Sequence, residues 1–291
     1  MTNVRAAFLR DRRVRVALRE IKASSVGRFL NYPRRLYRAL AATAPQLGMA
    51  VKWSIVSRED VNYTYPLKEA NLFYLASVLA YVTGEKITTV TGYINEVRTD
   101  NDLFQHVVNL SRTGPYRNHA DARCEFGRRV GWYALARILK PEIIVETGVD
   151  KGLGSVLLCS ALIRNGRGRY YGTDLNPKAG YLMQGAYHDV GTILYGDSIE
   201  SLQKFGEKID LFINDSDHSP AYELNEYKTV AKKLSPDAIV LGDNAHSSTV
   251  LAEWSEKMGR YFIFWREEPA RHWYRGGGIG ISLASRGHFV S

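Results

Sequence analysis

Residues 143–155 read IIVETGVDKGLGS, and this stretch decides the fold. It opens with an apolar run that is typical of a buried β-strand and passes through three glycines before a helical pattern begins. Glycine lets the backbone approach a ligand closely and adopt positive φ angles. In open α/β sheets, ligands bind beyond the carboxyl ends of the strands. The stretch therefore predicts a strand, a ligand-binding loop and a helix.

Apolar, β-rich runs alternate with helical patterns from about residue 121 onward. We expect seven strands, at 143–147, 170–174, 191–195, 211–214, 238–241, 261–265 and 278–283. We expect helices at 122–139, 154–164, 178–184, 199–205, 221–233 and 247–257. This alternation predicts an α/β fold, with a Rossmann-like, mostly parallel seven-stranded sheet between helices. No full-length helix separates the last two runs, so the last strand is expected to be antiparallel.

Residues 1–40 form a basic segment with eleven Lys and Arg residues against two acids, which equals the +9 net charge of the whole chain. Val14, Leu18 and Ile21 recur at helical spacing between arginines, so we expect an amphipathic helix with a cationic face. Such a helix suits peripheral contact with an anionic membrane or, with less support, nucleic acid. The structural alternative is a solvated helix packed on the body or on a second subunit.

The region 41–120 is expected to be helical, with helices at 68–82, 88–98 and 102–111. We interpret it as a cap that supplies the substrate pocket, and a purely structural extension is the alternative. Cys124 and Cys159 do not form a zinc-binding or disulfide pattern. No apolar run reaches the roughly 18 residues of a membrane span, and no apolar signal core follows the basic N-terminal residues. These features favour a cytoplasmic protein, peripheral at the membrane if residues 1–40 bind there.

Acidic residues end three successive expected strands. Glu146 can meet an ammonium group, Asp174 can accept hydrogen bonds from ribose hydroxyls, and Asp197 can accept from an adenine amino group. Any one of them could simply cap a helix, but three in order favour a nucleoside-like ligand. The glycine spacing differs from the G-x-G-x-x-G of dinucleotide sites and from the phosphate-binding P-loop. A dinucleotide oxidoreductase is therefore disfavoured.

The runs VETGVDKGLGS, GTDLNP and GDS resemble the first three motifs of the class I S-adenosylmethionine-dependent methyltransferases, over roughly residues 122–285. The resemblance implies a methyltransferase domain over residues 121–291, after the basic segment 1–40 and the cap 41–120. It also implies that S-adenosylmethionine is the cofactor. The residues expected around it are Glu146, Thr147, Gly148, Gly152, Ser155, Asp174, Asp197, Ser198 and Asp215.

A second group of polar residues follows the expected strands 211–214 and 238–241. Asp215 and His218 come directly after the first of these strands, and Asp243 and Asn244 come soon after the second. The two strand ends are neighbours in a parallel sheet, so Asp215, Asp243 and Asn244 could offer three oxygens to Mg²⁺ or another hard divalent cation. Such a metal would lower the pKa of a bound hydroxyl while a nearby base takes its proton.

This pairing is similar to the metal-dependent O-methyltransferases. The catechol and caffeoyl type has an Asp followed by an Asp-Asn pair, whereas the macrocin and rhamnosyl type has Asp-x-x-His, with the histidine as base. The chain combines Asp215 and His218 in that spacing with Asp243-Asn244, where the sugar-modifying group usually has Glu-Asp. The resemblance implies methylation of a small-molecule hydroxyl, on a sugar of a glycoside, glycolipid or natural product, by an enzyme that forms homo-oligomers. His246 is a second candidate base.

Two alternatives remain open at this point. One keeps the fold without the metal, as a metal-independent N- or O-methyltransferase of a small molecule. The other is a nucleic-acid-binding protein or RNA methyltransferase that uses the basic N-terminal residues. The balanced charge of residues 41–291 argues against the second alternative.

Overall fold

The computed structural model describes residues 16, 19–20, 24–59 and 64–284. The chain divides into two compact units, Met1–Val56 and Ser57–Ser291. The first unit contains helices α3 (Ser25–Leu30) and α4 (Tyr32–Val56). The expected boundary at residue 40 falls inside α4. Val14, Leu18 and Ile21, on which the N-terminal helix was predicted, lie outside the described residues.

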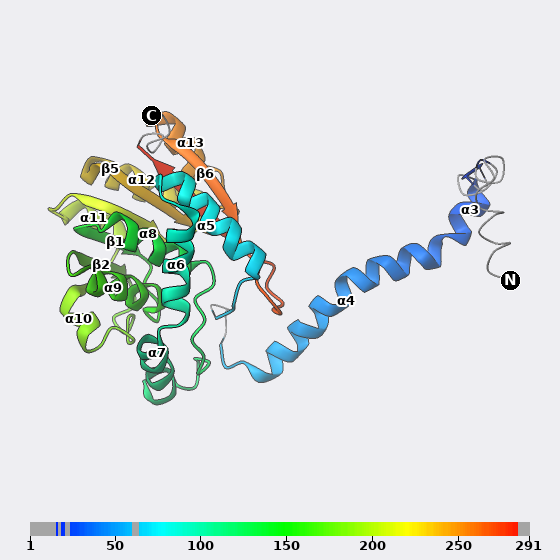
Figure 1. Cartoon of the computed structure of the whole chain (residues 1–291), viewed down its shortest axis with the longest axis horizontal. Coiled ribbons are helices and arrows are strands. Elements are labelled where there is room, and N and C mark those ends of the chain that lie inside the picture. The colour runs from blue at the N-terminus through cyan, green and yellow to red at the C-terminus, as the bar shows by residue number, and fades with distance from the viewer. Residues whose placement is uncertain (1–15, 17–18, 21–23, 60–63, 285–291) are drawn as a thin grey trace. The chain divides into compact units, whose positions relative to one another are not determined.

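The second unit is built on one seven-stranded sheet (Figure 1). Its strands are ordered β3-β2-β1-β4-β5-β7-β6. Strands β1 to β5 are parallel, and β7 runs antiparallel to both β5 and β6. The prediction of a mostly parallel, Rossmann-like sheet with an antiparallel last strand is confirmed. The strands are β1 (Ile143–Thr147), β2 (Arg169–Asp174), β3 (Gly191–Tyr195), β4 (Ile209–Asn214), β5 (Leu234–Asp243), β6 (Tyr261–Arg266) and β7 (Gly278–Leu283).

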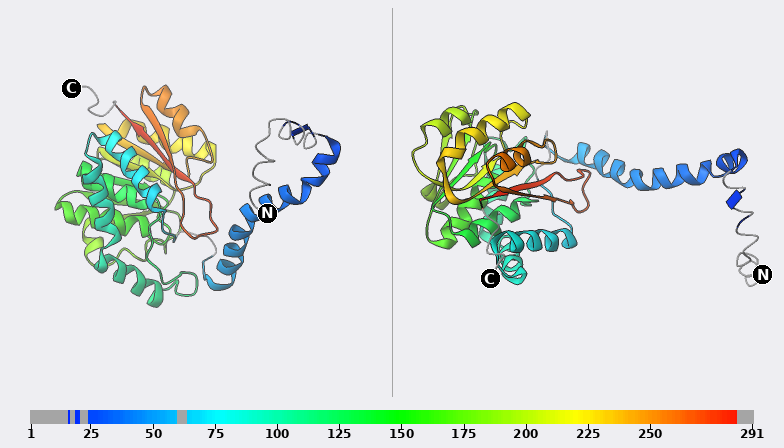
Figure 2. Two further views of the ribbon diagram at one scale, coloured as in Figure 1. Left: turned by 45° about the vertical axis from the view of Figure 1, so that its right-hand side comes forward. Right: turned by 90° about the horizontal axis from the view of Figure 1, so that it is seen from above.

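Helices cover both faces of this sheet (Figure 2). Alternate residues of a strand point to opposite faces. Ile144 packs in one core with α8 (Arg129–Leu139) and α9 (Leu153–Asn165). Ile143 and Val145 pack in another core, with α11 (Ser198–Lys204), α12 (Pro220–Val230) and α13 (Val250–Lys257). The helices that follow β1 onward are α9 (Leu153–Asn165), α10 (Ala186–Val190), α11 (Ser198–Lys204), α12 (Pro220–Val230), the short 3₁₀ turn η1 (Ala231–Lys233) and α13 (Val250–Lys257).

The helices before the sheet belong to the same unit and share its first core. They are α5 (Glu69–Thr83), α6 (Ile87–Arg98), α7 (Asn101–Thr113) and α8 (Arg129–Leu139). Leu75 and Leu79 of α5 and Ile94 of α6 are buried in the cluster that also contains Ile144. The predicted cap helices therefore extend the hydrophobic core of the sheet. Among the described residues, no helix is both long enough and apolar enough to cross a membrane.

Two predicted helices differ in the structure. Residues 178–184 form turns, because Gly180 adopts a φ of +71° and its N–H donates to Asp150 O at 2.6 Å. Leu182 N likewise donates to Lys151 O, so this backbone bonds to the loop after β1 instead of forming its own helical bonds. The helix predicted at 122–139 begins only at Arg129, after Gly127 with a φ of +54°.

Candidate functional site

The loop after β1 is held in a shape that only glycine permits. Gly148 has a φ of +85°, and a Cβ there would lie 2.0 Å from the carbonyl oxygen of Asp215. Gly148 N donates to Thr173 O at 2.9 Å, which ties the loop to the end of β2. Gly152, with a φ of +90°, is the N-cap of α9. The loop therefore crosses the carboxyl ends of β1, β2 and β4 at close range.

Glu146, at the end of β1, is 1% exposed. It accepts hydrogen bonds from the hydroxyls of Ser155 (3.2 Å) and Tyr170. Burial raises the pKa of its carboxyl group to about 8, against these hydrogen bonds, which act to lower it. A cationic ligand group beside Glu146 would favour the ionised form. The role predicted for Glu146, contact with an ammonium group of the ligand, stays a prediction.

The other two strand-end acids brace the backbone. One oxygen of Asp174 accepts from Val149 N at 3.0 Å and from Asp150 N at 2.8 Å, which fixes the loop after β1. Asp197 caps α11 by accepting from Glu200 N, and this bond lowers the pKa of Asp197. The capping alternative therefore describes Asp197 correctly, although its carboxylate also lines the cavity described next.

A cavity of about 480 Å³ lies over these strand ends. Of the residues predicted to surround the cofactor, six line it: Glu146, Gly148, Asp174, Asp197, Ser198 and Asp215. The other three, Thr147, Gly152 and Ser155, are not among its lining residues, and the buried Ser155 hydroxyl instead bonds to Glu146 and Tyr170. Three acids from successive strands thus face one cavity, which suits S-adenosylmethionine with its cationic and hydroxyl groups.

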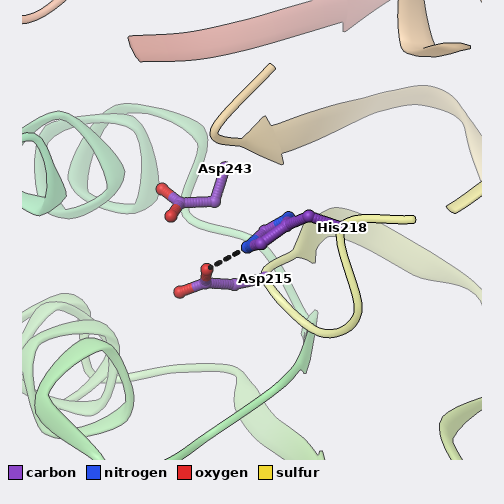
Figure 3. A group of neighbouring side chains, drawn as sticks. All are labelled: Asp215, His218 and Asp243. Carbon is purple, nitrogen blue, oxygen red and sulfur yellow. Dashed lines mark ion pairs between the residues drawn. The ribbon is translucent and has the colours of Figure 1, made fainter. Parts of the chain in front are cut away.

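The predicted metal ligands come together at the ends of β4 and β5. Figure 3 shows Asp215, His218 and Asp243 pointing toward one another. Their ligand atoms all lie within 4.8 Å of one another. Asn244 completes the group, with its Nδ2 3.2 Å from His218 Nε2. It adopts a left-handed φ of +56°, a conformation that asparagine tolerates better than most residues.

His218 lies between two carboxylates. Its Nε2 is 3.6 Å from Asp215 Oδ1, and its Nδ1 is 3.5 Å from Glu223 Oε1. Asp215 and then Glu223 raise the pKa of His218 to about 10. In the absence of another cation, His218 is therefore protonated at neutral pH. A positive charge bound by Asp215 would lower this pKa and favour the neutral imidazole that a base requires.

Sequence reasoning missed the most buried cation of the site. The guanidinium of Arg128 donates through Nε and Nη2 to both oxygens of Asp243, and through Nη1 to Glu267 Oε1 at 2.7 Å and Tyr65 Oη at 2.8 Å. Arg128 is 4% exposed. Burial alone would raise the pKa of Asp243, but Arg128 lowers it. The available signal was the pair Arg128-Arg129, which directly precedes the apolar residues 130–136.

The four polar residues differ in what they leave open to a metal ion. Asp215, His218 and Asn244 line the cavity, whereas Asp243 is 1% exposed and is not among the lining residues. Arg129 contacts Asp215 at 3.5 Å. The grouped carboxylates of Asp215 and Asp243 and the imidazole of His218 fit a divalent cation. Asn244 Oδ1 accepts from Arg128 Nη2 at 3.2 Å. Arg128 would then act as the hydrogen-bond donor that orients a ligating carboxylate.

Comparison with known proteins gives one sequence match. Residues 145–245 match the sequence model of a family described as "Methyltransferase domain". No curated protein matches the chain. The matched residues run from β1 to just past β5, so they contain the loop, the three strand-end acids and the predicted metal ligands.

Solved structures with a similar arrangement share little sequence with the chain. An O-methyltransferase, TomG, from Streptomyces achromogenes, in complex with SAM, is 13% identical, with a TM-score of 0.49; the match covers 66% of this chain and 95% of that one. A methyltransferase from Geobacter sulfurreducens is 17% identical, with a TM-score of 0.46; the match covers 68% of this chain and 97% of that one. An O-methyltransferase from Bacillus cereus in complex with SAH is 16% identical, with a TM-score of 0.44; the match covers 74% of this chain and 99% of that one.

The family match and the strand order agree about the central part of the chain. The match covers both halves of the site, and the sheet is mostly parallel with an antiparallel last strand, as predicted. The prediction of a methyltransferase agrees with this match, which covers residues 145–245, about a third of the chain.

Proposed function

We propose that the chain is an S-adenosylmethionine-dependent O-methyltransferase that uses a divalent metal ion, Mg²⁺ or a similar hard cation. The observation that carries this proposal is the position of Asp215. Its carboxylate lines the same cavity as Glu146, Asp174 and Asp197, and it also belongs to the cluster with His218 and Asp243. A donor site and an acceptor-activating site would thus meet at one residue.

The residues have distinct roles in this proposal. Glu146 faces the cationic part of the methyl donor, and Asp174 and Asp197 face its nucleoside part. Asp215, Asp243 and Asn244 hold the metal, which supplies positive charge that lowers the pKa of an acceptor hydroxyl. His218 takes the proton of that hydroxyl. The hydroxyl oxygen gains the methyl group as the carbon–sulfur bond breaks, and S-adenosylhomocysteine leaves as a neutral thioether.

The acceptor side of the cavity suits a molecule with several hydroxyl groups. Beyond the donor residues, many of the side chains that line the cavity are polar or charged, among them Glu59, Thr64, Ser111, Asp121 and Arg123. Hydrogen-bonding side chains of this kind can bind the hydroxyl groups of a sugar. We therefore infer a sugar hydroxyl, on a glycoside, glycolipid or natural product, as the acceptor.

A metal-binding measurement tests the proposal without knowledge of the acceptor. Titration with Mn²⁺, followed by the electron paramagnetic resonance signal of the free ion, should show one bound ion per chain. Asp215→Asn should weaken binding more than tenfold, because it removes a ligand that is open to the cavity. Asp217→Asn is the matched control, since Asp217 lies in the same loop but accepts from Ser219 N at 2.8 Å outside the cluster.

A second candidate function has its own observation. Arg128 already supplies a positive charge to Asp243, so the site could work without a metal as a metal-independent N- or O-methyltransferase. Transfer of a radioactive methyl group to a panel of glycosides, before and after EDTA treatment, separates the two. Full activity after EDTA, together with absence of Mn²⁺ binding, would refute the metal and leave the metal-independent enzyme. Equal Mn²⁺ affinity in Asp215→Asn and Asp217→Asn would also refute the assigned ligands.

A further inference from the structure

The helix α4 has an unusual composition for its length. Its 25 residues include no acidic side chain, but they include four basic ones: Arg34, Arg35, Arg38 and Lys52. At 1.5 Å per residue the helix is about 37 Å long, and Figure 1 shows it as one long helix. None of its residues is buried within the described chain. Gln46, Met49, Ala50 and Trp53 are half-buried, and the other side chains of the helix are exposed.

One face of α4 carries a continuous apolar stripe. Six large apolar residues follow at intervals of four or seven positions, which keeps them on one side of an α-helix. Their side chains are all exposed, from 44% to 77%. The stripe consists of Tyr32, Leu36, Leu40, Leu47, Val51 and Ile55. An exposed apolar stripe of this length indicates a surface that is covered in the working protein.

The basic residues lie on the side opposite to the stripe. With 3.6 residues per turn, each residue advances by about 100°. Arg34 and Lys52 then fall together, about 140° from Leu47, and Arg38 lies about 180° from it. Arg35 lies at the edge of this basic face. Met49, Trp53 and Val56 also fall on this side, so the separation of apolar from basic side chains is clearest in the N-terminal half of the helix. Such a separation is the pattern of helices that lie in a membrane interface.

The basic face and the apolar stripe of α4 together distinguish between its potential partners. A second copy packed through the stripe would cover the apolar residues and leave both basic faces unused. A nucleic acid would use the basic face and leave the apolar stripe exposed. An anionic lipid surface uses both features, because the acyl region takes the stripe and the headgroups take the cations.

We propose that α4 docks the protein on an anionic membrane surface. The helix lies in the plane of the interface, with the stripe from Tyr32 to Ile55 toward the acyl chains and Arg34, Arg35, Arg38 and Lys52 extending toward the headgroups. This inference does not depend on methyl transfer. It gives the enzyme access to acceptors held at a membrane.

Vesicle sedimentation with the full chain tests the proposal. The probes are vesicles of pure phosphatidylcholine and vesicles with about 30% phosphatidylglycerol. We expect binding to the anionic vesicles only. Each basic residue contributes about 1 kcal/mol near such a surface, or roughly fivefold in affinity. Replacing all four with glutamine should weaken binding on the order of several hundredfold.

Two further variants separate α4 from general electrostatic attraction. Glutamine at four exposed lysines of the methyltransferase unit, Lys204, Lys208, Lys228 and Lys232, removes the same charge and should leave binding unchanged. Serine at Leu36, Leu47 and Val51 keeps the charge and should weaken binding more than tenfold.

Three outcomes would overturn the proposal. The first is no binding to anionic vesicles, and the second is equal binding by the wild-type chain and the α4 glutamine variant. The third is a dimer or a polynucleotide complex that the stripe substitutions dissociate while vesicle binding stays unchanged. The glutamine and serine substitutions lie on exposed positions of a helix without buried residues, so loss of folding does not confuse the measurement.

Discussion

Replacing Arg128 with methionine should destabilise the protein severely. Methionine keeps much of the apolar volume but removes the guanidinium that pairs with Asp243 and Glu267. The side chains of both acids are 0% exposed, and that of Arg128 is 5% exposed. Breaking a buried ion pair by removing one partner costs about 3–5 kcal/mol, because the remaining charge is left without compensation. Here two carboxylates lose their cation, so the loss should reach the upper end of that range.

A loss of that size is large against the total stability of a folded protein, about 5–15 kcal/mol. Urea denaturation followed by tryptophan fluorescence measures the change. Arg167→Met is the matched control, because Arg167 pairs with Glu142 where the two side chains are 49% and 62% exposed. An exposed pair contributes less than about 1 kcal/mol. The control variant should therefore unfold nearly as the wild type does.

The double variant Arg128→Met, Asp243→Asn separates lost attraction from stranded charge. Asparagine has no charge to leave uncompensated, so the double variant should recover part of the stability lost by the single one. If the single variant fails to fold, the stability of the double variant can still be measured. A single variant that loses less than about 1 kcal/mol, as in the Arg167→Met control, would refute the reasoning that Arg128 neutralises the buried acids.

Three further predictions concern the cavity and its acids. Gly148→Ala should abolish binding of S-adenosylhomocysteine in calorimetry, since its Cβ would collide with Asp215 O. The control is Gly166→Ala, where φ is +66° and the space is open, so the variant should lose only about 1–2 kcal/mol of folding stability and still bind. Equal loss of binding in both variants would contradict this. Because the pKa of Glu146 is about 8, binding of S-adenosylmethionine at pH 7 should release a proton, measured as a heat that depends on the buffer; equal heats in phosphate and Tris would exclude it. The raised pKa of His218 should stabilise the fold fully below pH about 6.5, and that contribution should be lost as the pH rises through about 10. Urea denaturation of the wild type should therefore show a free energy of unfolding that declines over this pH range, and His218→Asn should lack the decline. An identical decline in both proteins would refute the prediction.

The sequence allowed prediction of the sheet because burial leaves a local record. Residues 143–145 are apolar, Glu146 and Thr147 follow them before the first glycine, and β1 spans Ile143–Thr147. Residues 178–184 have a helical pattern as well, yet Gly180 and Leu182 bond to the loop after β1. That competition involves residues about 30 positions away, so no local pattern records it. Helix predictions failed where tertiary backbone bonds replaced local ones.

Predictions for the candidate site succeeded and failed for the same reason. Residue types at strand ends predicted that Asp215, His218 and Asp243 would meet, because neighbouring parallel strands end at one edge of the sheet. The partner of Asp243 was not predictable in that way. Arg128 is 115 positions earlier in the chain and reaches Asp243 only after α8 packs on the sheet. Patterns of residue type predict which groups converge on a sheet edge, but they do not predict which charges neutralise one another there.

This difference separates two aspartates that the motif treats as equivalent. Asp243 is fully buried, and Arg128 donates to both of its oxygens, so its charge is balanced before any ligand arrives. Asp215 lines the cavity, and Arg129 contacts it only at 3.5 Å. A cation that enters from the cavity therefore meets Asp215 first, and its positive charge acts on His218 through the same carboxylate. In the proposed mechanism, Asp243 contributes mainly a fixed geometry, which the Arg128 network maintains, while Asp215 links the charge of the bound cation to the protonation of His218.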